Sequence, residues 1–129
     1  MSDHPNAVTV LRSFEAWNSG DLDVIRGYFT EDAVLHFAGN NAMSGTYRGR
    51  DAVIDALARA IQRWSPHSDV ESILVSDDHL MIFHHATGEH EGTRYDVTPV
   101  IAMKLDANGK VMEVWSLAND QSGYDQFWS

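Results

Sequence analysis

The sequence contains no cysteine, only three prolines, and nine lysines and arginines against 19 aspartates and glutamates, in a chain of 129 residues. The lack of cysteine excludes disulfide bonds and thiolate chemistry. The formal net charge of −10 repels phosphate backbones, and no basic patch offsets it, so we expect no nucleic-acid partner. No apolar run reaches the roughly 18 residues of a membrane-spanning helix. The polar segment 1–7 has no signal-peptide core, so we predict a cytoplasmic protein without a membrane partner.

The two halves of the chain have different hydrophobic patterns. The first half shows mostly helical spacing of apolar residues, and the second half shows the pattern of strands. Such segregation predicts an α+β fold, with helices packed on one face of an antiparallel sheet. The length fits one domain, which we place at residues 1–129.

Capping residues and prolines delimit three predicted helices. The first begins at Pro5, which fits the first turn of a helix because its missing N–H has no partner there. Asp21 predicts the N-cap of a second, short helix. The third helix is expected from about Asp51 to Trp64, and Pro66 prevents its continuation.

Five strands are expected around these helices: Ala33–Phe37, Val70–Ser76, Leu80–His90, Thr93–Leu105 and Lys110–Ala118. Residues 38–49 are rich in glycine and asparagine, and we predict a loop there. Strands of a dozen residues must twist and bend to stay within one small domain. The sheet is therefore expected to wrap around the helices as a cone. The aromatic tail, residues 119–129, is expected to dock on the pocket mouth or on a second subunit.

Several segments, in their order and spacing, resemble those of a known superfamily. They are FEAWNSGDLD at 14–23, YFTEDAV at 28–34, SGTYRGRDA at 44–52, NGKV at 108–111, EVW at 113–115 and NDQ at 119–121. Together they resemble the nuclear transport factor two-like (ketosteroid isomerase-like) superfamily, and the last three resemble its SnoaL-like branch. The resemblance covers nearly the whole chain. It implies a curved mixed or antiparallel sheet wrapped around three N-terminal helices, an internal pocket and a homodimer.

The superfamily includes isomerases, polyketide cyclases, epoxide hydrolases, dehydratases and binding proteins, so fold alone does not determine function. Ketosteroid isomerisation uses a carboxylate base, a tyrosine and a protonated aspartate. The corresponding positions here fall at Phe37, near Ser13 and at Ile101, which lack those groups. The epoxide hydrolase pattern needs two inward aspartates bridged by an arginine. The long strands offer only Arg94 and Asp96 near one end, so both mechanisms are set aside.

SnoaL-type cyclases resemble this chain better, and their aldol closure needs one acid or base beside an enolisable carbon. We predict Asp120, His84 and His36 as catalytic candidates. Strand alternation sends one of His84 and His85 inward, and the alignment of the turns with the superfamily favours His84. The same alignment turns His36 away from the pocket, unless a bulge redirects it. Two candidates have structural alternatives: Asp120 as a turn residue or a salt-bridge partner, and His84 as a hydrogen-bonded core histidine.

The ligand is expected to contact Trp17, Tyr28, Phe29, Phe37, Tyr47, Trp64, Ile101, Met103 and Trp115. Tyr47 would orient the ligand, and Trp115 is either a pocket wall or part of a dimer interface. We expect no metal and no cofactor, because the adjacent His84 and His85 face opposite sides of a strand and no metal-binding motif occurs.

The sequence therefore predicts a small hydrophobic organic ligand. The leading interpretation is an isomerase, cyclase or dehydratase that transfers protons on a carbonyl compound. The alternatives are a non-catalytic binding protein, or a dimerisation module with a filled core. A cavity on the order of several hundred Å³ would favour the first two interpretations.

Overall fold

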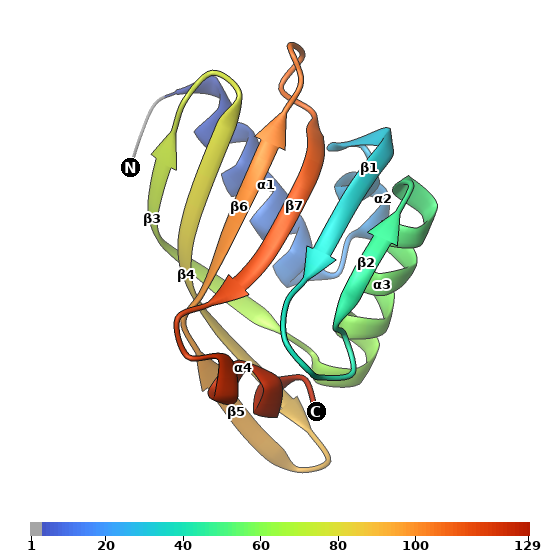
Figure 1. Cartoon of the computed structure of the whole chain (residues 1–129), viewed down its shortest axis with the longest axis vertical. Coiled ribbons are helices and arrows are strands. Elements are labelled where there is room, and N and C mark those ends of the chain that lie inside the picture. The colour runs from blue at the N-terminus through green and yellow to red at the C-terminus, as the bar shows by residue number, and fades with distance from the viewer. Residues whose placement is uncertain (1–3) are drawn as a thin grey trace.

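The computed structural model describes residues 4–129, in which a curved sheet carries helices on its inner side (Figure 1). The predicted α+β fold is confirmed. Its elements, in chain order, are α1 (Pro5–Ser19), α2 (Leu22–Arg26), β1 (Phe29–Phe37), β2 (Gly45–Arg48), α3 (Arg50–Trp64), β3 (His67–Val75), β4 (His79–His90), β5 (Thr93–Val97), β6 (Pro99–Leu105), β7 (Val111–Ala118) and α4 (Gln121–Phe127). No helix of the described part is long and apolar enough to cross a membrane.

The predicted helix boundaries follow from local capping. Gly20 ends α1 in the left-handed conformation, with φ of 71°, and its N–H bonds back to the last turn. The Asp21 side chain accepts a hydrogen bond from the backbone N–H of Val24 and so caps α2. At the end of α3, Ser65 takes a left-handed φ of 44° just before Pro66. These boundaries are determined by residues at or next to the helix ends.

The sheet is mixed, with the order β2-β1-β7-β6-β4-β3, and β5 pairs with β4. Strands β1 and β7 pair in parallel, whereas the other neighbours are antiparallel. The predicted loop 38–49 contains β2, which pairs with the end of β1, so that part of the prediction was wrong. The predicted strand Thr93–Leu105 is interrupted at Thr98, before Pro99. Its first part, β5, pairs with residues 86–90 of β4, and the hairpin projects below the sheet (Figure 1).

The core lies between the inner face of the sheet and the helices. Along β4, Leu80, Ile82, His84 and Ala86 are buried, whereas Met81 and Phe83 between them are exposed. This alternation follows from the two-residue period of a strand. The β4 side chains that face inward therefore reach the space under α1 and α3.

The aromatic tail forms a fourth helix, α4, which the sequence analysis did not predict. Tyr124, Phe127 and Trp128 are buried in the core of the same chain. The Asp125 carboxylate holds α4 against the segment after β1, because it accepts hydrogen bonds of 2.9 Å from the Asn40 backbone N–H and the Asn41 side chain. Of the two docking sites expected for the tail, the structure places it against the pocket.

Candidate functional site

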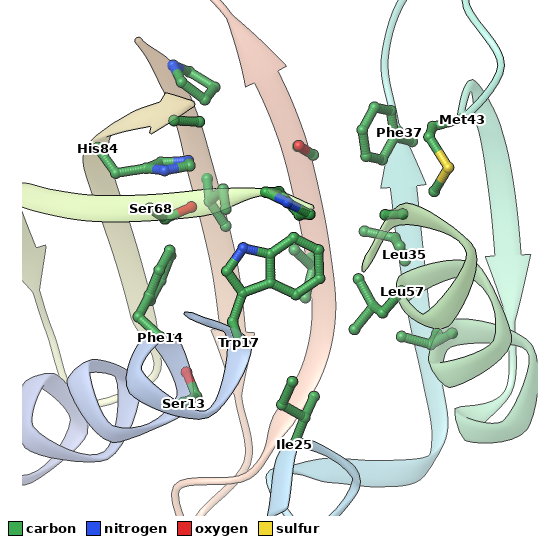
Figure 2. Close-up of a pocket in the computed structure, with 18 of the residues that line it drawn as sticks. Ser13, Phe14, Trp17, Ile25, Leu35, Phe37, Met43, Leu57, Ser68 and His84 are labelled. Atoms are coloured by element: carbon green, nitrogen blue, oxygen red, sulfur yellow. The ribbon is translucent and has the colours of Figure 1, made fainter. Parts of the chain in front are cut away.

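A cavity of about 130 Å³ lies between the helices and the inner face of the sheet. Figure 2 shows His84, Ser68 and Phe14 toward one side of it and Phe37, Met43 and Leu57 toward the other, with Trp17 between them. The lining side chains come from α1, α2, α3, α4 and every strand except β2, and nearly all are apolar. They include the predicted ligand-binding residues Trp17, Tyr28, Phe29, Phe37, Ile101 and Met103, together with the predicted catalytic residue His84.

The three positions that a ketosteroid isomerase would use all face this cavity. Ser13, Phe37 and Ile101 are lining residues. These are the positions that the resemblance aligned with the catalytic groups of that enzyme. Those places carry a hydroxyl group and two apolar side chains, so the carboxylate base and the two oxyanion donors of that mechanism are missing.

His84 is the most distinctive polar group of the cavity. It is only 5% exposed, and within the described residues neither ring nitrogen has a hydrogen-bond partner. Burial, and to a lesser degree the charge of His85, lower the pKa of His84 to about 4. The imidazole is therefore neutral at pH 7, with one N–H donor and one acceptor nitrogen available to a ligand.

The other polar groups of the lining residues are hydroxyl groups and the indole N–H groups of Trp17 and Trp128. Ser13 donates a 2.7 Å hydrogen bond to the Val10 carbonyl. Ser116 and Tyr124 share a short hydrogen bond, and burial raises the pKa of Tyr124. Among the described lining residues there is no aspartate, glutamate, lysine or arginine. The site therefore offers uncharged hydrogen-bonding groups in an apolar wall.

Asp120, one of the predicted catalytic residues, does not line this cavity. The side chain caps α4 by accepting a 3.1 Å hydrogen bond from the Gly123 backbone N–H. It is exposed, and it lines a second, polar depression together with Tyr95 and Gln126. The reason is topological: the chain turns into α4 directly after β7, and the free N–H groups of that helix attract the carboxylate.

His36 also lies away from the cavity, on the outer face of β1, as strand alternation predicted. Its Nε2 is 2.5 Å from the Glu113 carboxylate and its Nδ1 is 3.3 Å from the Thr46 hydroxyl. The ring stacks on Trp115, with the centroids 5.4 Å apart. Trp115 is therefore not a pocket wall, and the first of its two predicted positions was wrong.

Tyr47 and Trp64 do not line the cavity either. The Tyr47 hydroxyl donates a 2.7 Å hydrogen bond to the Met43 carbonyl, so it positions the loop and leaves Met43 to line the site. Trp64 lies behind Trp128, with the ring centroids 5.0 Å apart. Both residues support the wall from behind.

The sequence analysis missed several lining residues, including Met43, Ser68, Tyr124 and Trp128. Two of them belong to the aromatic tail, whose composition did indicate docking. Met43 lies in the segment predicted as a loop, and nothing local indicates its direction. In the described part of the chain, no group of three or more histidine, aspartate or glutamate side chains could hold a metal ion.

Comparisons with known proteins agree with this architecture. A family model described as the SnoaL-like domain matches residues 10–114. The structure of Bal32a, from a soil-derived mobile gene cassette, is 31% identical, with a TM-score of 0.89 and 96% of both chains covered. A protein with a cystatin-like fold from Xanthomonas campestris is 24% identical, with a TM-score of 0.86 and 96% of this chain and 98% of that chain covered.

A more distant structure carries a small molecule. Rv0760c from Mycobacterium tuberculosis, in complex with estradiol-17β-hemisuccinate, is 15% identical, with a TM-score of 0.79 over 90% of this chain and 95% of that chain. The two structures below 25% identity share the fold. No curated protein matches the sequence.

Proposed function

Because this chain belongs to the family of SnoaL-like domains, we propose that it binds one small, largely apolar organic molecule whose carbonyl or hydroxyl group hydrogen-bonds to His84. The observation that carries the proposal is a buried imidazole with two unpartnered nitrogens in an otherwise apolar cavity. A buried polar group without a partner costs about 1–3 kcal/mol. A ligand oxygen beside the ring removes that cost, and the complex of Rv0760c with a steroid ester supports an organic ligand in this fold.

Proton transfer on a carbonyl compound, as in an isomerase, cyclase or dehydratase, is the second candidate. It is supported by the same imidazole, which can donate its N–H to a carbonyl oxygen while remaining neutral. The low pKa makes His84 a weak base, and Asp120 and His36 lie outside the cavity. Binding needs only the groups described, whereas turnover needs a further proton acceptor, so we place binding first.

The test is ligand binding by wild type and by two His84 variants. Calorimetric titration with neutral ketones, enones and phenols is expected to give at least one saturable ligand. His84→Phe is expected to weaken it about 5- to 30-fold, which corresponds to about 1–2 kcal/mol. His84→Gln keeps a donor and an acceptor and is expected to recover part of the affinity. The exposed His79, also on β4, serves as the matched control through His79→Gln.

Two results would contradict the proposal: no binding of any compound, or equal binding by wild type and His84→Phe. The same samples test the catalytic candidate. If the bound compound is converted, His84→Gln is expected to lower kcat by about 10²- to 10⁴-fold, the usual contribution of one acid–base group. Binding without conversion would leave only the binding function.

We also propose that two copies of the chain associate through the outer face of the sheet. Phe83, Val100 and Leu117 lie side by side on β4, β6 and β7. Phe83 is 39% exposed and Leu117 is 40% exposed. Two chains of charge −10 repel each other, so contact is least unfavourable on an uncharged, apolar face. A second copy presents the same face and so completes a two-fold interface.

A further inference from the structure

The volume of the cavity limits its ligand. The cavity has a volume of about 130 Å³. An apolar cavity of about 150 Å³ is known to bind benzene, whereas sites for drug-sized ligands measure about 300–1,000 Å³. The space under this sheet therefore corresponds to one six-membered ring with a small substituent. It is also smaller than the several hundred Å³ that would have favoured an enzyme or a binding protein over a dimerisation module with a filled core.

The aromatic side chains that form one wall of the cavity also pack against one another and against further rings outside the cavity. The Phe37 ring meets Tyr124 at 5.4 Å and Trp128 at 5.3 Å between centroids. Trp128 is in turn held between Trp64, at 5.0 Å, and Phe127, at 4.6 Å. A ring supported from behind by other rings cannot move aside without disturbing the whole cluster. The limit on ligand size is therefore a property of the core and not of one mobile side chain.

The electrostatics of the cavity restrict the charge of the ligand. The titratable side chains that line it are His84, Tyr28 and Tyr124, and none of the described lining residues is a lysine or arginine. The His84 ring is neutral because its pKa is lowered to about 4. A carboxylate or an ammonium group on the ligand would lose its hydration shell without gaining a counter-charge, which is strongly unfavourable. The chain's net charge of −10 also disfavours the approach of anions.

From these observations we infer the chemical class of the ligand: an uncharged, single-ring molecule with one carbonyl or hydroxyl group, rather than a steroid or another fused-ring compound. The inference rests on the proposed function, since it assigns the ligand oxygen to His84. The ring then lies against Phe14 and Trp17, which stand beside His84 in the cavity (Figure 2). Fused-ring ligands would require the aromatic cluster behind Phe37 to open.

Four matched probes test this inference on the wild-type protein. Phenol is the uncharged single ring, toluene replaces its hydroxyl group by a methyl group, benzoate carries a charge and 2-naphthol adds a second ring. We expect phenol to bind at least fivefold more tightly than toluene, and benzoate and 2-naphthol to bind at least tenfold more weakly than phenol. Titration calorimetry gives the affinities, and the ring signals of His84 and the indole N–H signal of Trp17 in NMR spectra report the site.

A cavity-enlarging variant makes the size argument specific. Leu57 lines the cavity from α3, where alanine is a strong helix former, so Leu57→Ala adds volume with little change to the helix. We expect this variant to bind 2-naphthol at least tenfold more tightly than wild type does. Leu74→Ala removes the same atoms from a side chain that is 59% exposed, and it should leave all four affinities unchanged.

The outcomes separate this inference from the proposed function. Tighter binding of 2-naphthol or benzoate than of phenol by wild type would overturn the ligand class. If that binding still weakened in His84→Phe, the proposed function would stand. If none of these compounds and no ketone or enone bound at all, the result would contradict both the inferred ligand class and the proposed function.

Discussion

The imidazole of His84 lies edge-on to the ring of Phe14, with the centroids 5.4 Å apart and the planes inclined by 62°. Strand β4 places His84 on the inner face, and α1 covers it with Phe14. With an aromatic neighbour on one side and an apolar cavity on the other, the ring has no hydrogen-bond partner among the described residues. This environment lowers the pKa of His84 from 6.5 to about 4.

The lowered pKa predicts a specific dependence of stability on pH. Below pH 6.5 the unfolded chain binds a proton at His84, whereas the folded protein binds it only near pH 4. The contribution of His84 to the free energy of unfolding is therefore fully present above pH 6.5, and it is lost as the pH falls toward 4. When the pH is lowered from 7 to 5, the free energy of unfolding of wild type should decrease by about 2 kcal/mol more than that of His84→Gln. Urea unfolding at both pH values measures this difference.

The control for that measurement is the neighbouring histidine on the outer face of the same strand. His85 pairs with Asp96 instead of facing the cavity. His85→Gln should therefore keep the large loss of stability between pH 7 and pH 5. An identical loss in wild type and His84→Gln would show that the buried ring titrates normally.

The position of Asp120 predicts a structural role. Asparagine caps helices as well as aspartate does, so Asp120→Asn should change the free energy of unfolding very little. Asp120→Ala leaves the Gly123 N–H without its partner and should cost about 1 kcal/mol. Neither change should alter ligand affinity, because the carboxylate lies outside the cavity. A loss of binding or turnover in Asp120→Asn at unchanged stability would show that Asp120 takes part in ligand binding or catalysis.

The turn at Gly39 predicts how tightly α4 is held. Gly39 has a φ of +97°, and a Cβ atom there would lie 2.1 Å from the Gln121 amide nitrogen and 2.2 Å from an Asp125 oxygen. Gly45 has a φ of +138° with nothing within 4 Å of such an atom. Gly39→Ala should therefore cost about 1–3 kcal/mol more than Gly45→Ala. It should also speed hydrogen exchange of α4, and similar exchange in both variants would contradict the close contact.

The apolar outer face of the sheet predicts the oligomeric state. Sedimentation equilibrium should give a dimer for wild type and a monomer for Leu117→Glu, because the charge would be buried without a partner. Val24→Glu is the matched control, since Val24 is 45% exposed on α2, away from the sheet. A monomeric wild type, or a dimeric Leu117→Glu variant, would rule out association through this face.

Some of the fold could be predicted because its causes are local. Pro5 and Asp21 determine where helices begin through the backbone groups of their own first turns. On β4 and β1, the two-residue period of a strand puts neighbouring side chains on opposite faces, and the alignment of the turns with the superfamily selected His84 as inward and His36 as outward. The order of the motifs also predicted the family and the curved mixed sheet. Signals of this kind lie within a few neighbouring residues, so the sequence contains them directly.

Tertiary contacts alone decided the rest. Residues 45–48 form a strand only because they pair with β1, and the seven residues of α4 are too few to form a stable helix alone. Burial of Tyr124, Phe127 and Trp128 stabilises α4, and its N-terminus draws Asp120 away from the cavity. The volume of the cavity depends on how rings from distant segments pack together. The sequence by itself thus determined the fold family and the inward histidine, whereas long-range packing decided the walls, the size and the absence of charge around that histidine.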